Sequence, residues 1–168
     1  MKAVFHAVDL VSTWTAKAVS WFCVALVLVI TYDVAKRYLF GGATIWVYET
    51  ATMLGATIYV MGWAYIQRLG EHIRVDILFV RLPPKIRLVL DLIANLLFLL
   101  PLLAVMINTS IFYMLRAWRI NEKLAETFWY PPAGPFKTML VIALSLFALQ
   151  TLVQFIRDIY LLKGGRAP

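Results

Sequence analysis

Four long stretches of the sequence contain no Asp, Glu, Lys or Arg, and they constrain the fold more than any other feature. These stretches cover residues 18–32, 50–67, 92–115 and 138–156. A helix that spans a bilayer needs roughly 17 to 25 mostly apolar residues. The last three stretches reach that length, and Lys17 can extend the first by placing its ammonium group among the headgroups. The sequence therefore predicts four transmembrane helices.

The composition excludes an ordinary soluble domain. The chain of 168 residues is 62% hydrophobic and 15% charged, whereas a soluble domain is roughly half apolar and a quarter charged. We therefore expect an all-α membrane protein with one domain, residues 1–168, and spans near 14–36, 47–68, 85–115 and 136–160. The net charge of +7 is explained by headgroup attraction and topology, so no nucleic-acid partner is expected.

The distribution of basic residues predicts the orientation. Four spans place both termini and the connector between spans two and three on one side of the membrane. Ten of the 16 Lys and Arg residues fall on that side and six on the other. Because cytoplasmic loops carry the excess of Lys and Arg, we expect both termini to be cytoplasmic.

The connector between spans two and three, "GEHIRVDILFVRLPP", interleaves charged and apolar residues too finely for a solvated loop. At helical spacing Val75, Leu78, Phe79 and Leu82 share a face, which predicts a short amphipathic helix lying in the membrane interface. The strict alternation of "HIRVDI" also allows a strand. Pro83 and Pro84 suit the start of the third helix. The residues expected to anchor this segment to phospholipid headgroups are Arg68, His72, Arg74, Asp76, Arg81, Lys85 and Arg87.

The connector at residues 116–137 mixes charge with aromatic residues of the kind that collect at membrane interfaces. We expect an interfacial helix here as well. Pro131, Pro132 and Pro135 then impose a turn before the last span.

Several polar residues and one proline lead to predictions about local structure. Asp33 and Arg37 are spaced for an i, i+4 ion pair. The helix dipole favours Glu49 at the start of span two, and contact with a cation of span one or with another subunit is the alternative. Pro101 is expected to bend span three.

Further expectations concern packing within the bundle. Gln150, Gln154 and Asp158 form a stripe that should face protein, either a neighbouring helix or the lining of a path. The small residues Ala51, Gly55 and Gly62 should pack against another helix, and Cys23 should be a small buried residue.

No acid lies near the middle of any span, and the two histidines, His6 and His72, lie outside the spans. A proton-coupled transporter normally keeps an ionisable group at depth, and axial haem ligands must lie within the bundle. The sequence has no metal-ligand, phosphate-loop or nucleophile–base motif. We therefore expect no enzymatic activity and no cofactor, and such a protein usually serves a partner.

The ordered motifs resemble a known family. These are "RYLFGGATIWVYET" (37–50), "WAYIQRLGEHIRVDIL" (63–78) and "LPPKIRLVLD" (82–91). They are similar to the small membrane subunit of tripartite ATP-independent periplasmic (TRAP) transporters. That family has Arg-Tyr near the end of helix one, Trp-x-x-Glu opening helix two, and Gly-x-His-Ile-x-Val-Asp in the connector.

The resemblance implies a non-catalytic scaffold subunit in the bacterial inner membrane. A large membrane subunit carries substrate and sodium by an elevator movement, and a periplasmic substrate-binding protein captures an organic acid. The small subunit is then expected to bind neither substrate nor sodium. Arg37, Trp46 and Glu49 are expected to form a periplasmic-side cluster that braces helices one and two or touches the large subunit. A self-sufficient small oligomeric transporter and a redox membrane anchor are the alternative functions.

Overall fold

The fold is known from a computed structural model that describes residues 2–42, 44–69 and 83–162. It contains α1 (Lys2–Phe40), α2 (Val47–Leu69) and α6 (Ala133–Leu162). Between α2 and α6, α4 (Pro84–Ala94), the π-helix η1 (Asn95–Leu99) and α5 (Leu100–Arg119) follow one another without a break. The all-α class is confirmed for these residues, in which Lys123 and Pro132 form an isolated bridge but no strand occurs.

Three of the described helical stretches are long and apolar enough to cross a membrane. They are residues Phe5–Phe40, Leu88–Arg119 and Ala133–Leu162. α2 is not among them, because its sequence includes Thr, Gly, Tyr and Gln among the apolar residues. At 23 residues it is still about 34 Å long, so a count of four spans stays a prediction.

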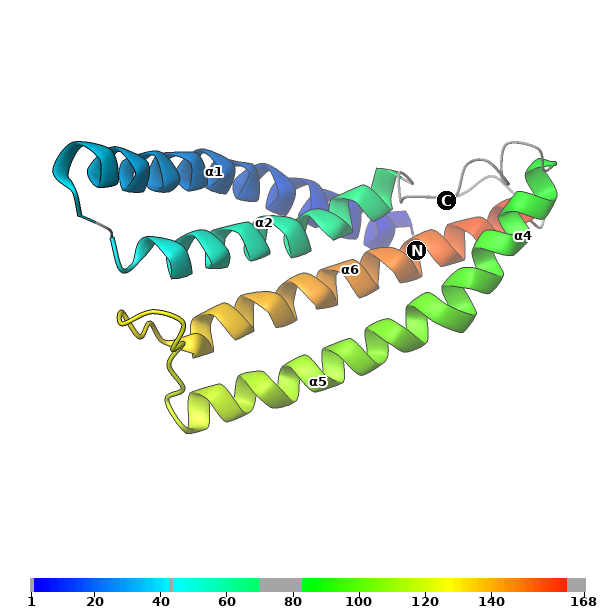
Figure 1. Ribbon diagram of the computed structural model, residues 1–168. Coiled ribbons are helices and arrows are strands. Elements are labelled where there is room, and N and C mark those ends of the chain that lie inside the picture. The colour runs from blue at the N-terminus through cyan, green and yellow to red at the C-terminus, as the bar shows by residue number, and fades with distance from the viewer. Residues whose placement is uncertain (1, 43, 70–82, 163–168) are drawn as a thin grey trace.

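The helices lie side by side in the order α1, α2, α6, α5 (Figure 1). α2 packs against α1 and α6, and α6 packs against α2 and α5. One third of the most apolar stretch of α6 is buried, against 6% for those of α1 and α5. α6 is therefore the central helix, and α1 and α5 form the edges that face lipid or a partner.

Two small clusters of buried side chains hold the row together. Val19, Met61 and Ala143 join α1, α2 and α6. Ala64, Leu103 and Phe147 join α2, α5 and α6, with Trp63 packed against Phe147. Each cluster is small because every helix in the row has neighbours on only one or two sides. The apolar core within this chain is therefore small, and polar contacts at the helix ends add to it.

Proline determines the start and the bend of the third helical stretch, as the sequence predicts. α4 begins at Pro84 after Pro83, where a missing N–H breaks no helical bond. Pro101 lies in the first turn of α5, directly after the π-helix, and the Leu100 N–H bonds to the Asn95 carbonyl. The ribbon changes direction between α5 and α4 (Figure 1). The expected bend is confirmed, and the π-helix accommodates the missing amide of the proline.

The connector between α5 and α6 corrects one prediction. Residues 120–132 contain no helix and form a compact loop instead. The Glu122 N–H bonds to Ala117 O (2.9 Å), Leu124 N–H to Pro131 O (2.9 Å) and Ala133 N–H to Glu122 O (2.8 Å). Asn121 and Tyr130 adopt positive φ to permit these turns. The prediction of an interfacial helix here is wrong, because the prolines and these backbone bonds impose a hairpin-like path.

Two packing predictions also fail. Cys23 is exposed on α1, not buried, because α1 is an edge helix. A Cβ placed on Gly55 or Gly62 would meet nothing within 4 Å. The two glycines therefore have open space beside them within this chain, whereas Ala64 of the same helix is buried against α5 and α6.

Gly134 is different, and its surroundings give a testable prediction. A Cβ at Gly134 would lie 3.0 Å from the Trp118 ring, whose Nε1–H donates to Thr138 Oγ1 at 2.9 Å. Gly134→Ala should force the indole away and lower stability by about 1 kcal/mol. The matched control Gly62→Ala should be neutral or stabilising, since it adds a helix-favouring methyl in open space. Thermal unfolding of both variants in detergent measures the difference, and equal midpoints would contradict it.

Candidate functional site: two polar clusters at the ends of the helix row

A group of polar side chains joins three helices near the start of α1. The Asp9 carboxylate accepts hydrogen bonds from two residues of α6, Arg157 Nη2 at 2.6 Å and Gln150 Nε2 at 2.9 Å. Arg68 of α2 lies with Nε 3.8 Å from the same carboxylate and donates to the Thr13 hydroxyl. We call this group the Asp9 cluster, and its members are Asp9, Ser12, Thr13, Arg68, Gln150 and Arg157.

The interior of the Asp9 cluster is closed to solvent. Gln150 and Ser12 are fully buried, and the Ser12 hydroxyl donates to Gln150 Oε1 at 3.0 Å. Gln150 therefore donates to one residue of α1 and accepts from another. Buried amides and carboxylates are stable only when such partners are present. The cluster fixes α1 against α6 in one register, because a shift by one residue would break several bonds at once.

The stripe on α6 faces protein, as predicted. Gln150 binds α1, and Gln154 Nε2 donates to Asp158 Oδ1 at 3.1 Å. Asp158 is also buried. Of the two predicted surroundings, a neighbouring helix or the lining of a path, the neighbouring helix is correct for Gln150.

The Asp9 cluster lies at the rim of the apolar stretches. Arg157 directly follows the uncharged stretch that ends at residue 156, and Asp9 precedes the one that begins at residue 18. The Asp9 and Arg157 side chains are only 13% and 20% exposed, so the paired charges are largely shielded from the surroundings. Sequence reasoning missed Asp9 and Ser12, because their partners are about 140 residues away along the chain and only folding brings them together.

The expected interfacial anchor residues fall in different places. Arg68 contacts Thr13 and Asp9 at the end of α2, and Lys85 and Arg87 belong to α4. The short helix or strand expected after α2 lies outside the described residues, as do His72, Arg74, Asp76 and Arg81.

At the opposite end of the row, Asp33 organises the turn between α1 and α2. Its carboxylate pairs with Arg37 Nη2 at 2.7 Å, so the predicted local ion pair is confirmed. The other oxygen, Oδ1, accepts the Thr44 N–H at 3.2 Å and the Thr44 hydroxyl. Gly41, with φ of 64°, lets the chain leave α1 in a left-handed conformation. These bonds tie the loop back to the helix that precedes it.

Glu49 joins α2 to the connector before α6. Its side chain is 1% exposed, and Oε1 accepts the Thr127 N–H at 2.8 Å. The second oxygen, Oε2, is buried without a hydrogen-bond partner among the described residues. Thr127 was not singled out by sequence reasoning, because a backbone donor in a distant loop leaves no signal in residue type.

The three residues expected to cluster at this end make separate contacts. Trp46 stacks on Tyr32 of α1 with ring centroids 5.9 Å apart. Arg37 pairs with Asp33 and remains largely exposed, while Glu49 bonds to Thr127. Trp46 thus joins α1 to α2, and Glu49 joins α2 to the connector. That the three residues act together as one cluster stays a prediction.

A second ion pair stiffens the same connector. Lys137 Nζ lies 2.6 Å from Glu122 Oε2 and 5.9 Å from the centroid of the Tyr113 ring. The connector is thus fastened to α2 through Glu49, to α5 through the bond from Glu122 N–H to Ala117 O, and to α6 through Lys137.

The polar contacts at both ends of the row join helices and loops to one another. In the part of the chain that the structure describes, no three His, Cys, Asp or Glu side chains lie together to form a metal site. The ionisable side chains of the Asp9 cluster, and Asp33 and Glu49 at the opposite end, mainly form ion pairs and hydrogen bonds within the chain. The fold and its clusters therefore define a small multi-span membrane protein braced at both ends.

Comparison with known families gives the class a name. Residues 26–160 match the family described as tripartite ATP-independent periplasmic transporters, DctQ component. The match covers well over half of the chain, so the chain belongs to this family of small TRAP permease components. This is a family of transporter components and not of enzymes. No curated protein matches the chain.

The match begins at residue 26. Asp9, Ser12 and Thr13 therefore lie outside the matched region, and their partners Arg68, Gln150 and Arg157 lie inside it. The start of α1 is thus fastened by ionic and hydrogen bonds to the part of the chain that defines the family.

Proposed function

We propose that this chain is a non-catalytic scaffold subunit of a sodium-coupled importer of organic acids. It packs beside the large membrane subunit, anchors it in the inner membrane and works with a periplasmic substrate-binding protein. Family membership supports a component of such a tripartite transporter. The observation that carries the scaffold role is the position of the polar groups, which brace the ends of the helix row and leave its apolar stretches uncharged.

Rigidity is the property that an elevator transporter requires from its fixed part. The Asp9 cluster joins α1, α2 and α6 at one end, and Glu49 joins α2 to the α5–α6 connector at the other. Vertical movement of such a row would carry these charges into hydrocarbon, at a cost of about 3 kcal/mol for each charge. The chain thus supports a partner that moves against it.

Its orientation and anchoring form part of the same proposal. With both termini cytoplasmic, the Asp9 cluster lies on the cytoplasmic side and Glu49 on the periplasmic side. The connector with His72, Arg74, Asp76 and Arg81 then lies along the cytoplasmic headgroups together with Lys85 and Arg87. Each basic residue near an anionic leaflet contributes about 1 kcal/mol of attraction.

At the periplasmic end, Arg37 and Trp46 are the members of the proposed cluster that can reach a partner. Arg37 is 61% exposed, whereas Glu49 is 1% exposed. We infer that Glu49 acts inside the chain by fixing the connector, and that the Arg37 guanidinium is available to the large subunit.

Reconstitution in proteoliposomes tests the scaffold role. Sodium-driven uptake of radiolabelled organic acids should require the large subunit, the binding protein and this chain together. The chain alone should give no uptake, because its four long uncharged stretches contain no Asp, Glu, Lys or Arg. Uptake by this chain alone would contradict the proposal, and full uptake in its absence would do so as well.

A further inference from the structure

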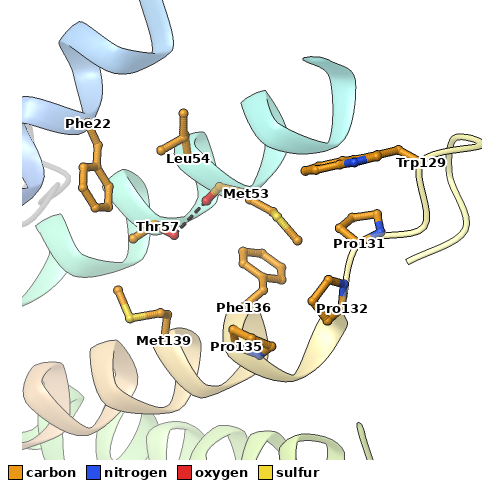
Figure 2. Close-up of a pocket in the computed structure, with 10 residues that line it drawn as sticks. All are labelled: Phe22, Met53, Leu54, Thr57, Trp129, Pro131, Pro132, Pro135, Phe136 and Met139. Atoms are coloured by element: carbon orange, nitrogen blue, oxygen red, sulfur yellow. Dashed lines mark hydrogen bonds between the residues drawn. The ribbon is translucent and has the colours of Figure 1, made fainter. Parts of the chain in front are cut away.

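One apolar pocket lies at the junction of α1, α2, the α5–α6 connector and α6 (Figure 2). Its volume is about 340 Å³, and it is open to the surroundings instead of being sealed. A volume of that size holds roughly ten groups as large as a water molecule. A methylene group is of similar size, so the pocket has room for a segment of hydrocarbon chain.

The lining of the pocket excludes a polar ligand. Of its ten lining residues, Thr57 alone carries a hydroxyl, and that hydroxyl is already bonded to Met53 O at 2.7 Å. A bound water needs two to four polar partners, which the lining does not supply. Figure 2 shows the Phe22, Met53, Phe136 and Met139 side chains turned toward the pocket. The chemistry therefore selects an apolar occupant.

The position of the pocket identifies the source of that occupant. Phe22, Thr57 and Met139 belong to three of the four uncharged stretches, so this part of the pocket lies at the depth of the hydrocarbon. Trp129 and Pro131 come from the charged connector and lie at the other end of the pocket (Figure 2). The open side is thus continuous with the lipid-facing surface, from the interface toward the membrane interior.

The shape of the lining favours a lipid chain over a helix of another subunit. Helices approach one another in membranes through small residues, whereas this pocket is lined by Phe, Met, Trp and Pro. Methionine adapts to flexible apolar ligands. Trp129 is 47% exposed, and its indole N–H has no acceptor among the described residues. Interfacial Trp residues place an apolar ring in hydrocarbon and a polar edge toward headgroups.

We propose that the pocket binds one acyl chain of a phospholipid from the leaflet on the side of the α5–α6 connector. The chain lies between α2 and α6 and reaches Phe22 and Met139 with its far end. Trp129 lies over the glycerol end and offers its indole N–H to an ester carbonyl. The bound lipid adds to the small core between α1, α2 and α6, since Phe22 and Met139 of the pocket pack against the Val19, Met61 and Ala143 cluster.

Photo-crosslinking with depth-specific probes tests this assignment without any substitution. The chain is placed in phosphatidylcholine nanodiscs that contain a phosphatidylcholine with a diazirine either near the glycerol or near the chain end. The glycerol-proximal probe should label Trp129–Pro132, and the chain-end probe should label Phe22 and Phe136–Met139. Adducts are located by peptide mass spectrometry. Equal labelling of both regions by both probes would overturn the proposal.

A pocket-filling variant gives the second measurement. Met139→Trp should lower chain-end labelling of the peptide that contains Phe22 about tenfold, since it removes the space for two or more methylene groups. Val105→Trp on α5 is the matched control, because Val105 is exposed and lies outside the pocket; its labelling should be unchanged. Loss of wild-type labelling when the large subunit is co-purified would show that a protein segment occupies the pocket and would overturn the assignment.

Discussion

Replacing Asp9 by Ala is expected to destabilise the helix row by about 3 kcal/mol, since removal of one partner from a desolvated ion pair leaves the other charge uncompensated. Arg157 would lose both of its bonds to the carboxylate, and Gln150 Nε2 would lose its acceptor. Arg68 would keep Thr13 but lose the nearby negative charge. The free energy of unfolding in mixed micelles, followed by circular dichroism, measures the loss.

Two comparisons separate the Asp9 cluster from a general effect of charge. Arg37→Ala removes an exposed i, i+4 pair and should cost at most about 0.5 kcal/mol. The double variant Asp9→Ala with Arg157→Ala should be less unstable than the sum of the single variants, because the Arg157 charge that Asp9→Ala leaves unpaired is then removed as well. Strict additivity, or an Asp9→Ala loss no larger than that of Arg37→Ala, would show that the ion pair does not hold the row together.

Replacing Glu49 by Ala is expected to release the α5–α6 connector. The Thr127 N–H would lose its acceptor inside the protein, and a hydrogen bond to a charged group contributes about 2 kcal/mol. Backbone amides from Thr127 to Tyr130 should then exchange hydrogen faster in nanodiscs. Co-purification with the large subunit should also fall, while the number of sodium ions per substrate should stay the same, because the proposed scaffold role places Glu49 outside the transport path.

The connector itself supplies the control for Glu49. Glu126 is exposed in the same loop, so Glu126→Ala should leave amide exchange unchanged. Glu49→Gln retains an acceptor oxygen of nearly the same shape and should preserve most of the protection. An altered sodium coupling ratio in Glu49→Ala would place this residue in the transport path and would contradict the scaffold role.

The Asp9 cluster and the Glu49 contact differ in what they stabilise. The Asp9 cluster joins helices directly through side chains, and it extends the family region by fastening the start of α1 to it. The Glu49 contact joins a helix to a loop through a backbone amide. Loss of the first should loosen the whole row, whereas loss of the second should act locally on the surface that the connector presents. Comparing unfolding with local amide exchange distinguishes the two effects.

Features that depend on neighbours along the chain were predicted well. The i, i+4 pair of Asp33 and Arg37, the start of α4 at Pro84 and the bend near Pro101 all follow from local spacing and backbone chemistry. The burial of Gln150 follows from the cost of a polar amide in lipid. Predictions that required knowledge of helix order failed, as for Cys23 on an edge helix and for the glycines of α2.

The sequence by itself determined a helical membrane protein of the TRAP small-subunit family, because uncharged length and motif order are properties of the linear chain. Only the tertiary structure decided which helix is central, which carboxylates are buried and what they bind. Asp9 meets Arg157 across about 150 positions, and Glu49 meets a backbone amide that residue type does not reveal. Such contacts depend on how the helices are arranged in space, and hydrophobic patterning is compatible with several arrangements.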